Sequence, residues 1–563
     1  MNSVATVREQ AIEVLRAHGM TTIFGNPGST ELPMLADLPD DFRYVLALHE
    51  GAAVGMADGY AQASGRPAHA NLHTAPGVGN AVGALGTAQA NHAPVLVTAG
   101  QQVRAQIGFE ALLTNRDAIL VPQPHVKWAH EPSRAQDVPA ALARAIHHVS
   151  LPPRGPAFVS VPMDDWDAEA DGDLSAATVA RRVSGRCAPD EPELARLAAR
   201  LEAARSPALV VGPEVDAAGG WESAVALAER QRLVVWAAPA PGGSRIGFPE
   251  RHRCFAGLLP PAIAPLAQAL SAHDLVVVAG SAVFPYYPYV PGPPLASGCE
   301  LVALTSDPSE AARAPMGDAI VGDVATALAR LVELTGTAED RPQPAGRPAP
   351  GEPAAAASGA GPAADAGGQL QGGVAPVLEG GRRLSGSQAA AALAAAWPDD
   401  AIAVVELPSS VLALRNRLRP DRPGSWYSSA SGGLGFGIAA AVGVALAQPS
   451  RPVVCVLGDG SAQYGITALW TAVAYRVPVT FVVLRNDEYA ILKWFAQMSG
   501  ATGVPGLDLP GLDVAAVARG YGMTAKEVGG SIEELVAELR TALGAGEGPR
   551  LIQVPVAAGM WVQ

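Results

Sequence analysis

Short apolar runs rich in β-branched residues recur along the chain, and stretches with the helical spacing of apolar residues separate them. Runs of this length between glycine-rich turns are typical of buried strands. In the first part of the chain the expected elements are an amphipathic helix over Val4–His18 and strands over Thr21–Phe24, Tyr44–Leu48, Pro67–Leu72, Val95–Ala99 and Ala157–Val161. This alternation predicts a parallel sheet covered by helices.

The same pattern restarts twice further along the chain. A second set of expected strands comprises Ala208–Val211, Leu233–Ala237, Leu275–Ala279 and Leu301–Leu304. A third set comprises Ala401–Val405, Val453–Leu457, Val479–Leu484 and Leu551–Val554. We therefore predict an α/β protein with three doubly wound parallel-sheet domains, over residues 1–180, 186–333 and 386–563.

A segment of different composition separates the second and third sets. Between Arg341 and Gly381, alanine, glycine and proline supply 28 of 41 residues, and neither an aromatic residue nor an isoleucine occurs. Such a segment buries too little apolar surface to offset the entropy lost on ordering. An alanine-rich helix is the alternative, but seven prolines interrupt it. We expect a flexible, disordered linker over residues 336–384.

Composition and charge narrow the class of protein. The chain of 563 residues is 49% apolar, which is ample for several cores, and its formal net charge of −14 comes without a basic block. Nucleic acid is therefore not an expected partner. The four cysteines lie far apart, so neither a zinc cage nor a disulfide framework is expected. The N-terminus lacks a secretory pattern, and these features together favour a reduced, cytoplasmic protein.

The longest apolar stretch, Gly432–Ala447, contains five glycines and is shorter than a membrane span of about 18 residues. We interpret it as a buried helix, so a membrane partner is not expected either.

The strongest candidate for chemistry lies in the third domain. The strand ending at Leu457 runs into Gly458, Asp459, Gly460 and Ser461, and Asn486 follows the next expected strand, 27 residues after Asp459. Ligands bind at the carboxyl ends of parallel strands. Carboxylate and amide oxygens suit Mg²⁺ or Ca²⁺, the glycines permit close approach of a diphosphate, and Ser461 with the following helix N-terminus can donate hydrogen bonds to it. The alternative is an ordinary glycine turn with a capping aspartate.

This motif, with an asparagine at that spacing, resembles the signature of thiamine diphosphate enzymes. Such enzymes need a carboxyl group beside the aminopyrimidine ring, which promotes formation of the reactive ylid. The resemblance implies Glu50 for this role, since Glu50 ends an expected strand and opens a helix of small residues. A glutamate favoured only by the helix dipole is the alternative. The resemblance also implies a cofactor that bridges two subunits.

Several other segments resemble benzoylformate decarboxylases, a family of thiamine diphosphate-dependent 2-oxo acid decarboxylases. They are Phe24–Ser29, Ala111–Asn115, Ala312–Ala319, Gly432–Phe436 and Ala468–Ala472. The resemblance covers nearly the whole chain apart from the linker. It implies that the three domains are pyrimidine-binding, middle and diphosphate-binding, and that the protein is a homo-oligomer, at least a dimer and commonly a tetramer.

The resemblance also implies residue roles. Ser29 would bind the substrate carboxylate, with a helix N-cap as the alternative, and His73 would transfer protons, with a structural histidine as the alternative. Leu434 would be the apolar wedge under the cofactor. The remaining implied contacts are Asp459, Asn486 and the Glu488 backbone carbonyl to the metal, and Ser409, Gly458, Gly460, Ser461 and Tyr489 to the diphosphate.

Three positions depart from the family pattern. Tyr287 stands where the family has a second catalytic histidine, and a phenol with a pKa of about 10 is a poor acid–base group near neutral pH. Ile491 replaces a small residue and should narrow a pocket that Leu112, Leu113 and Phe495 line. Pro408 replaces a hydroxyl residue near the diphosphate and removes one donor.

The function expected from this resemblance is non-oxidative decarboxylation of an aromatic 2-oxo acid such as benzoylformate, through the ylid and an enamine, to an aldehyde and CO₂. The resemblance implies a carboxy-lyase of the mandelate pathway. The alternatives are an aliphatic 2-oxo acid decarboxylase, an acetolactate synthase-like carboligase and a catalytically silent binding protein. An NAD enzyme is a weaker alternative because the glycines from Gly77 onward lack the dinucleotide spacing.

Overall fold

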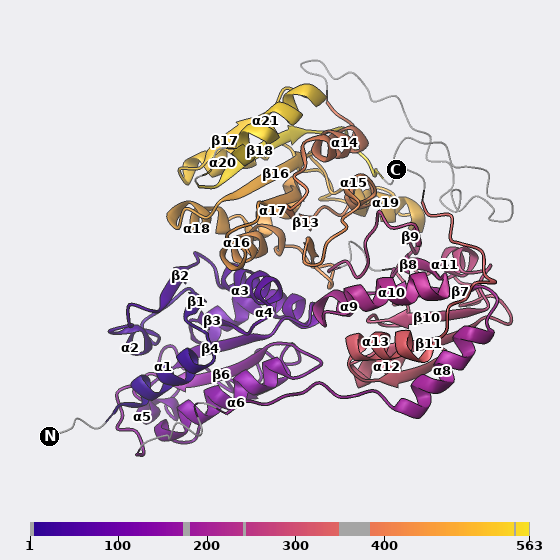
Figure 1. Cartoon of the computed structure of the whole chain (residues 1–563). Coiled ribbons are helices and arrows are strands. Elements are labelled where there is room, and N and C mark those ends of the chain that lie inside the picture. The colour runs from indigo at the N-terminus through magenta and orange to yellow at the C-terminus, as the bar shows by residue number, and fades with distance from the viewer. Residues whose placement is uncertain are drawn as a thin grey trace.

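Three parallel sheets, each of six strands, organise the chain (Figure 1). The computed structural model describes residues 5–172, 179, 181–239, 244–347, 383–544, 546 and 548–561. Helices cover both faces of each sheet, and separate clusters of buried apolar side chains lie on the two faces. The predicted fold class is therefore confirmed, whereas the exact domain bounds stay a prediction.

The first sheet has the strand order β2-β1-β3-β4-β6-β5. Its strands are β1 (Thr22–Gly25), β2 (Arg43–Leu46), β3 (Ala68–Leu72), β4 (Val95–Gln101), β5 (Trp128–His130) and β6 (Ala157–Pro162). The helices are α1 (Val7–Ala17), α2 (Leu32–Leu35), α3 (Glu50–Ser64), α4 (Thr74–Ala90), α5 (Arg104–Ile107) and α6 (Val138–Ser150). Helix α1 begins at a capping box in which Thr6 and Glu9 satisfy each other's backbone N–H groups.

The second sheet has the order β12-β11-β10-β7-β8-β9. Its strands are β7 (Pro207–Val211), β8 (Val234–Ala237), β9 (Phe255–Leu258), β10 (Leu275–Ala279), β11 (Glu300–Thr305) and β12 (Asp318–Val321). The helices are α8 (Glu191–Ala203), α9 (Pro213–Ala217), α10 (Trp221–Gln231), α11 (Ile263–Ala269), α12 (Pro308–Arg313) and α13 (Val324–Leu334).

The third sheet has the order β14-β13-β15-β16-β18-β17. Its strands are β13 (Ile402–Glu406), β14 (Trp426–Ser428), β15 (Val453–Gly458), β16 (Val479–Arg485), β17 (Thr524–Glu527) and β18 (Arg550–Pro555). The helices are α14 (Gly386–Ala396), α15 (Val411–Leu418), α16 (Gly437–Ala447), α17 (Asp459–Gly465), α18 (Ala468–Ala474), α19 (Ala490–Ser499), α20 (Val514–Gly520) and α21 (Ile532–Gly544).

Two sequence-based expectations differ from the structure. The helix expected over Gly432–Ala447 begins only at Gly437, because Gly432 and Gly435 have φ angles of +73° and +108° that a right-handed helix excludes. Residues 336–347 of the expected linker pack on the second domain, where the Arg341 guanidinium donates to the carbonyls of Gln231 and Glu202. The rest of the expected linker, 348–382, lies outside the described residues.

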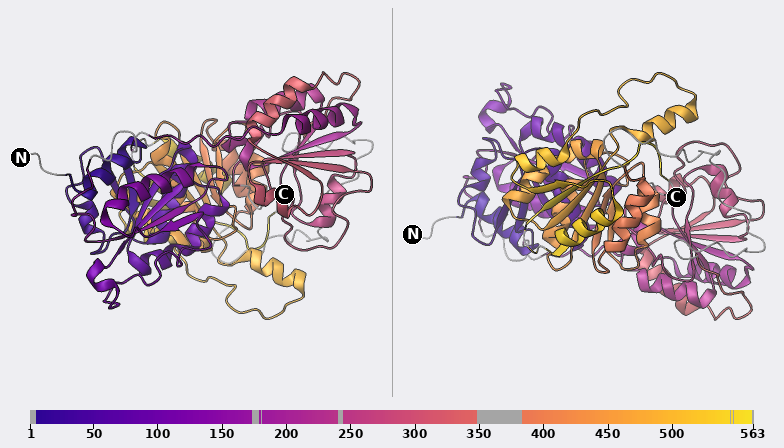
Figure 2. Two further views of the ribbon diagram at one scale, coloured as in Figure 1. Left: turned by 90° about the horizontal axis from the view of Figure 1, so that it is seen from below. Right: turned by 90° about the horizontal axis from the view of Figure 1, so that it is seen from above.

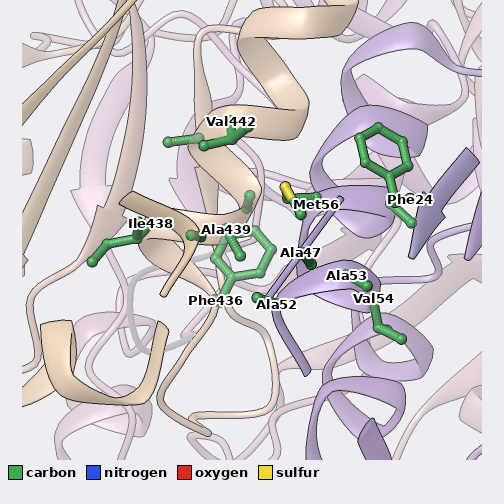
Figure 3. Close-up of a cluster of buried hydrophobic side chains, with 14 of the residues drawn as sticks. Phe24, Ala47, Ala52, Ala53, Val54, Met56, Phe436, Ile438, Ala439 and Val442 are labelled. Carbon is green, nitrogen blue, oxygen red and sulfur yellow. The ribbon is translucent and has the colours of Figure 1, made fainter. Parts of the chain in front are cut away.

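The first and third domains meet at two helices of small residues, α3 and α16, and the second domain lies beside them (Figure 2). Figure 3 shows Met56 of α3 facing Ala439 and Val442 of α16. A Cβ at Gly443 would lie 2.0 Å from the Met56 carbonyl oxygen. Glycine at this crossing therefore lets the backbones touch, and it fixes the start of α3 relative to the third sheet. Among the helices of the described chain, none is long and apolar enough to cross a bilayer.

Candidate functional site

The candidate site residues form two groups, each at the carboxyl ends of a parallel sheet. The first group follows strands β1, β2 and β3. Glu50 is the first residue of α3 and is 6% exposed. Its carboxylate accepts hydrogen bonds from the side-chain amides of Asn26 at 3.2 Å and Asn80 at 3.0 Å. The sequence placed Glu50 correctly between strand and helix, but Asn26 and Asn80 were missed as its partners.

His73 lies directly after β3 and borders the same glycine as Glu50. A Cβ at Gly77 would lie 3.0 Å from Glu50 Oε1 and 3.3 Å from His73 Cβ. The structure therefore brings these two candidate residues together, although 23 positions separate them in the chain. The side chain of His73 is 20% exposed, so part of the ring contacts solvent and the rest packs against the protein.

Glu31 is the partner of His73, and the sequence analysis missed it. Its carboxylate oxygen Oε2 lies 2.8 Å from His73 Nδ1, and Glu31 is 1% exposed. Thr30 Oγ1 lies 3.3 Å from the same ring nitrogen. A glutamate immediately after the Phe24–Ser29 segment was the available signal, but its burial depends on packing that the local sequence does not report.

Ser29 lies in an exposed turn between β1 and α2. Its alternative reading as a helix N-cap is wrong, because the N-cap position of α2 belongs to Glu31 and no side chain caps it. The backbone N–H of Gly28, next to Ser29, donates to Glu31 Oε2 at 2.8 Å. The Ser29 turn and the His73 ring therefore depend on the same carboxylate oxygen.

The second group lies after β15 and β16 in the third domain. Asp459 is 1% exposed, and its two carboxylate oxygens accept the backbone N–H groups of Gly460 and Asp487, each at 2.9 Å. Burial raises the pKa of Asp459, and these N–H groups oppose the rise. Asn486 follows β16, so the structure brings the motif of β15 and the turn after β16 together.

The turn from Asn486 to Glu488 carries two of the expected oxygen ligands, and the Asn486 side-chain oxygen accepts the Glu488 N–H at 3.3 Å. Asp487 has a φ of +59°, a left-handed conformation that turns the chain sharply between its neighbours. The carboxylate of Asp487 pairs with Arg383 at 2.6 Å, so it is held by that arginine. Asp459, the Asn486 side-chain oxygen and the Glu488 backbone carbonyl are all hard oxygen donors. This donor set fits Mg²⁺ or Ca²⁺.

The segment after Asp459 fits a diphosphate. A Cβ at Gly460 would lie 2.6 Å from the Tyr489 ring, so only glycine permits this close packing. Ser461 is 5% exposed at the first turn of α17, and a Cβ at Gly458 would lie 3.6 Å from Ser461 Oγ. The carbonyl of Ser409 accepts the backbone N–H of Trp561 at 2.9 Å, which ties the C-terminal segment to this region.

Glu406, at the end of β13, is a further residue that the sequence pattern did not single out. It is 6% exposed and accepts the backbone N–H groups of Gly435 at 2.6 Å, Phe436 at 3.1 Å and Gly437 at 3.0 Å. Burial raises its pKa to about 7, against the lowering effect of these N–H groups. Glu406 therefore holds the segment that carries Leu434, and an acid at the end of an apolar strand was the available signal.

The expected pocket residues are only partly assembled within one chain. The rings of Tyr287 and Phe495 lie 5.1 Å apart, which joins the second domain to helix α19. Ile491 lies one helical turn before Phe495, on the same face. Leu113 is half-buried, with a φ of +71°, and Leu112 is 86% exposed in the loop after α5. Its side chain therefore projects into solvent in the single chain.

The side chain of Glu488 has partners of its own, which the sequence analysis did not expect. Its Oε1 accepts the backbone N–H of Gly559 at 2.7 Å, and its Oε2 pairs with Lys493 of α19. Glu488 therefore links the expected metal-binding turn, the pocket helix and the C-terminal segment.

Comparisons with known proteins place the chain in a family. Family models match the thiamine pyrophosphate enzyme N-terminal TPP-binding domain over residues 5–121, the central domain over 194–331 and the C-terminal TPP-binding domain over 409–554. The benzoylformate decarboxylase of Pseudomonas aeruginosa is 50% identical over 98% of each chain. The structure of a Rhodococcus jostii 4-hydroxybenzoylformate decarboxylase superposes with a TM-score of 0.90 at 43% identity, covering 99% of this chain and 100% of that one. An acetolactate synthase large subunit of Parasynechococcus marenigrum is 28% identical over 97% of this chain and 87% of its own.

The chain has three doubly wound domains, and the first and third carry acidic residues at the ends of their strands. This arrangement is typical of the class of cofactor-binding α/β enzymes. Within that class, the chain belongs to the thiamine pyrophosphate enzyme family. The resemblance to thiamine diphosphate-dependent 2-oxo acid decarboxylases that its motifs predict is confirmed.

Proposed function

We propose that this protein is a thiamine diphosphate- and Mg²⁺-dependent decarboxylase that converts an aromatic 2-oxo acid, benzoylformate or a ring-substituted analogue, into an aldehyde and CO₂. The observation that carries the proposal is the placement of buried Glu50 and partly exposed His73 on either side of Gly77. The chain that carries these residues is 50% identical to a benzoylformate decarboxylase over 98% of its length. Thiamine diphosphate, when bound, supplies the electron sink that loss of CO₂ requires.

Glu50 would hold and protonate the aminopyrimidine ring of the cofactor. Its two oxygens each keep a further acceptor site after the hydrogen bonds from Asn26 and Asn80. The start of α3 and these two amides fix the carboxyl group rigidly. A fixed carboxyl can exchange a proton with a ring nitrogen without reorganising the site.

Ser29 and His73 would act on the substrate. Ser29 offers a hydroxyl donor in an exposed turn, which suits a carboxylate that must leave as neutral CO₂. His73 would accept a proton and return it to the reacting carbon. Tyr287 would contribute a hydrogen bond at most, because its phenol is a weak acid.

Asp459, Asn486 and the Glu488 carbonyl would hold the Mg²⁺ or Ca²⁺ ion, and Gly458, Gly460, Ser461, Ser409 and Tyr489 would surround the diphosphate. Leu434 would support the cofactor from below, since Glu406 holds the backbone at Gly435. The oxygen-only donor set, with Asp459 buried and Asn486 and Glu488 partly exposed, supports this assignment.

A second copy of the chain would complete the site. Large apolar side chains are exposed beside the first group, including Leu48 at 42%, Phe109 at 85% and Leu112 at 86%. Tyr464 and Leu492, near the second group, are 60% and 46% exposed. Exposed apolar surface around a site supports burial by a partner. We therefore propose a homo-oligomer, at least a dimer and by family resemblance a tetramer, which light scattering of the purified protein will test.

The packing of the second domain favours a decarboxylase over an acetolactate synthase-like carboligase. Resemblance to acetolactate synthases would imply that the protein also binds FAD, a dinucleotide. A dinucleotide would bind where the strand order reverses, between β10 and β7. Gly247 packs closely at this point, because a Cβ at Gly247 would lie 2.5 Å from the carbonyl oxygen of Gly212, the residue after β7. The four free cysteines support a reducing, cytoplasmic location.

Aldehyde release from benzoylformate, 4-hydroxybenzoylformate, pyruvate and a branched aliphatic 2-oxo acid tests the proposal. Each assay contains thiamine diphosphate and Mg²⁺, with the Glu50→Gln variant as the blank. We expect the aromatic acids to have the highest kcat/KM. Turnover of aliphatic acids alone, acetolactate formation from pyruvate, or full activity in the blank would each contradict the proposal.

A further inference from the structure

We propose that Glu31 is a positioning residue that holds the proton of His73 on Nδ1 and so keeps Nε2 free to accept and return the reaction's proton. The proposal rests on the proposed function, because it assigns a task to His73 in that reaction. The juxtaposition that carries it is the 2.8 Å contact between Glu31 Oε2 and His73 Nδ1, with Glu31 fully enclosed at 1% exposure.

The hydrogen-bond partners of Glu31 determine which ring nitrogen carries the proton. Its Oε1 accepts the Gly100 N–H at 2.7 Å and the Thr30 hydroxyl at 2.8 Å. Its Oε2 accepts the Gly28 N–H at 2.8 Å. Backbone N–H groups only donate, so both oxygens of Glu31 act as acceptors. A carboxylate with these donors has no proton of its own to give, so His73 Nδ1 is the donor, and in a neutral imidazole Nε2 is left with the lone pair.

The surrounding backbone is built for this contact. A Cβ at Gly28 would lie 2.1 Å from His73 Nδ1, and one at Gly100 would lie 2.2 Å from Glu31 Oε1. Neither position therefore accepts any residue but glycine without moving the pair. His73, at the N-cap position of α4, has its backbone fixed by the Gly77 N–H donated to its carbonyl at 2.7 Å.

The same carboxylate also connects the two groups that would act on the substrate. Gly28 N–H and His73 Nδ1 share Oε2, and Ser29 follows Gly28 directly. A change at Glu31 is therefore expected to affect the proton carrier first and the Ser29 turn second. The expected signature is a large fall in kcat with a smaller rise in KM.

The substitution Glu31→Gln makes a specific prediction about the imidazole. An amide has one acceptor oxygen, whereas Gly100, Thr30 and Gly28 all donate to Glu31. The Oε1 side meets three donors, from Gly100, Thr30 and, at 3.4 Å, the Thr74 N–H, so we expect the amide oxygen to stay there. The NH₂ group then faces the Gly28 N–H and His73 Nδ1, and of these two groups only the imidazole can change from donor to acceptor. We therefore expect the proton of His73 to move to Nε2 in this variant.

Magic-angle-spinning nitrogen-15 NMR of the holoenzyme, with the ring nitrogens of its 11 histidines labelled, measures this tautomer. The His73→Gln variant identifies the His73 signals. We expect protonated Nδ1 in the natural protein and in Glu31→Asp, and protonated Nε2 in Glu31→Gln. The Glu250→Gln variant is the control, because Glu250 is an equally buried glutamate paired with Arg415, away from His73. It should leave the His73 signals unchanged.

Kinetics provide a second reading. General acid–base catalysis contributes roughly 10²–10⁴-fold, and we expect Glu31→Gln to lower kcat about a hundredfold, with Glu31→Asp recovering part of the loss. In a His73→Ala background, Glu31→Gln should lower kcat further by less than about threefold, because the two residues act as a unit. Multiplicative losses, or an unchanged tautomer in Glu31→Gln, overturn the proposal.

The two proposals fail separately. If the natural protein does not turn over any aromatic 2-oxo acid, the proposed function is wrong, but the tautomer measurement still tests the Glu31–His73 pair. If Glu31→Gln does not fold, Glu31→Asp decides: the proposal requires Nδ1 to remain protonated in it, and loss of that proton with the charge retained overturns the positioning role.

Discussion

The first and third domains both place buried carboxylates at the ends of parallel strands, but they hold them differently. Glu50 in the first domain accepts from two side-chain amides, and Glu31 accepts from a hydroxyl and an imidazole as well as from backbone. Asp459 and Glu406 in the third domain accept from backbone N–H groups. Side chains can rotate or change tautomer, whereas the backbone cannot. The first domain is thus suited to moving protons and the third to holding a fixed anion and cation.

The largest expected effect is at Glu50. Glu50→Gln keeps the shape of the side chain but removes its exchangeable proton, so we expect turnover of benzoylformate to fall by roughly 10²–10⁴-fold. Thermal unfolding should change little, because an amide can still accept from one of Asn26 and Asn80. Steady-state kinetics with saturating cofactor measure the loss. Retention of more than a tenth of the activity would contradict a proton-exchanging role for the first domain.

The next effect is at the metal-binding turn. Asp459→Asn leaves one amide nitrogen facing a backbone N–H, either that of Gly460 or that of Asp487. We expect weaker binding of Mg²⁺ and diphosphate, by about 10–100-fold, with activity recovered in part by excess Mg²⁺. Calorimetric titration of the cofactor, with chelator-treated natural protein as the reference, measures this. Unchanged Mg²⁺ dependence would show that Asp459 is structural only.

A smaller effect is expected at two further buried acids. Backbone N–H groups donate to Glu406, whereas the side chains of Gln62 and Asn91 donate to Asp58 at 2.8 Å each. Glu406→Gln leaves at least one N–H of residues 435–437 unpaired, at a cost of about 1–3 kcal/mol in the free energy of unfolding. Asp58→Asn should cost less, because the Gln62 amide can reorient and present its oxygen to the new NH₂ group. Chemical denaturation of both variants tests the difference, and equal losses would break the comparison.

The same two acids predict a pH dependence. Burial raises the pKa of Glu406 from 4.5, and that of Asp58 from 3.8, to about 7. The folded protein therefore binds these protons more tightly than the unfolded chain does. Stability from these groups is present below their ordinary pKa values and is lost as the pH rises to about 7. The melting temperature of either amide variant, followed from pH 5 to 8, should depend less on pH than that of the natural protein.

The smallest effect concerns the pocket. Ile491→Ala removes three carbons from the face of α19 that also carries Phe495. One methylene in an apolar pocket changes kcat/KM by about 10–200-fold, so we expect the preference for benzoylformate over a branched aliphatic acid to rise about tenfold or more. The ratio of the two kcat/KM values measures it. An unchanged ratio would mean that Ile491 does not line the substrate pocket.

The strands that the sequence pattern predicted are mostly the central ones, and those it missed lie at sheet edges. They are β5, β9, β12, β14 and β17. Residues of β12 and β17 are mostly exposed, so these strands lack the apolar run that marks a buried strand. An edge strand is defined by its hydrogen bonds to a neighbour, such as Thr524 to Glu527 of β17 pairing with β18. That information lies in the partner strand.

The candidate site divides in the same way. The sequence alone determined the strand–turn–helix units with their side chains, such as Gly458 to Ser461 after β15 and Glu50 at the start of α3, because apolar runs and glycine turns are local. Only the tertiary structure decided that Glu31 contacts His73 and that Glu406 holds the turn before α16. Glu31 and His73 are 42 positions apart, and Glu406 and Gly435 are 29 apart. Which distant donors meet a buried carboxylate depends on how the strands order and the helices pack, and no local pattern encodes that.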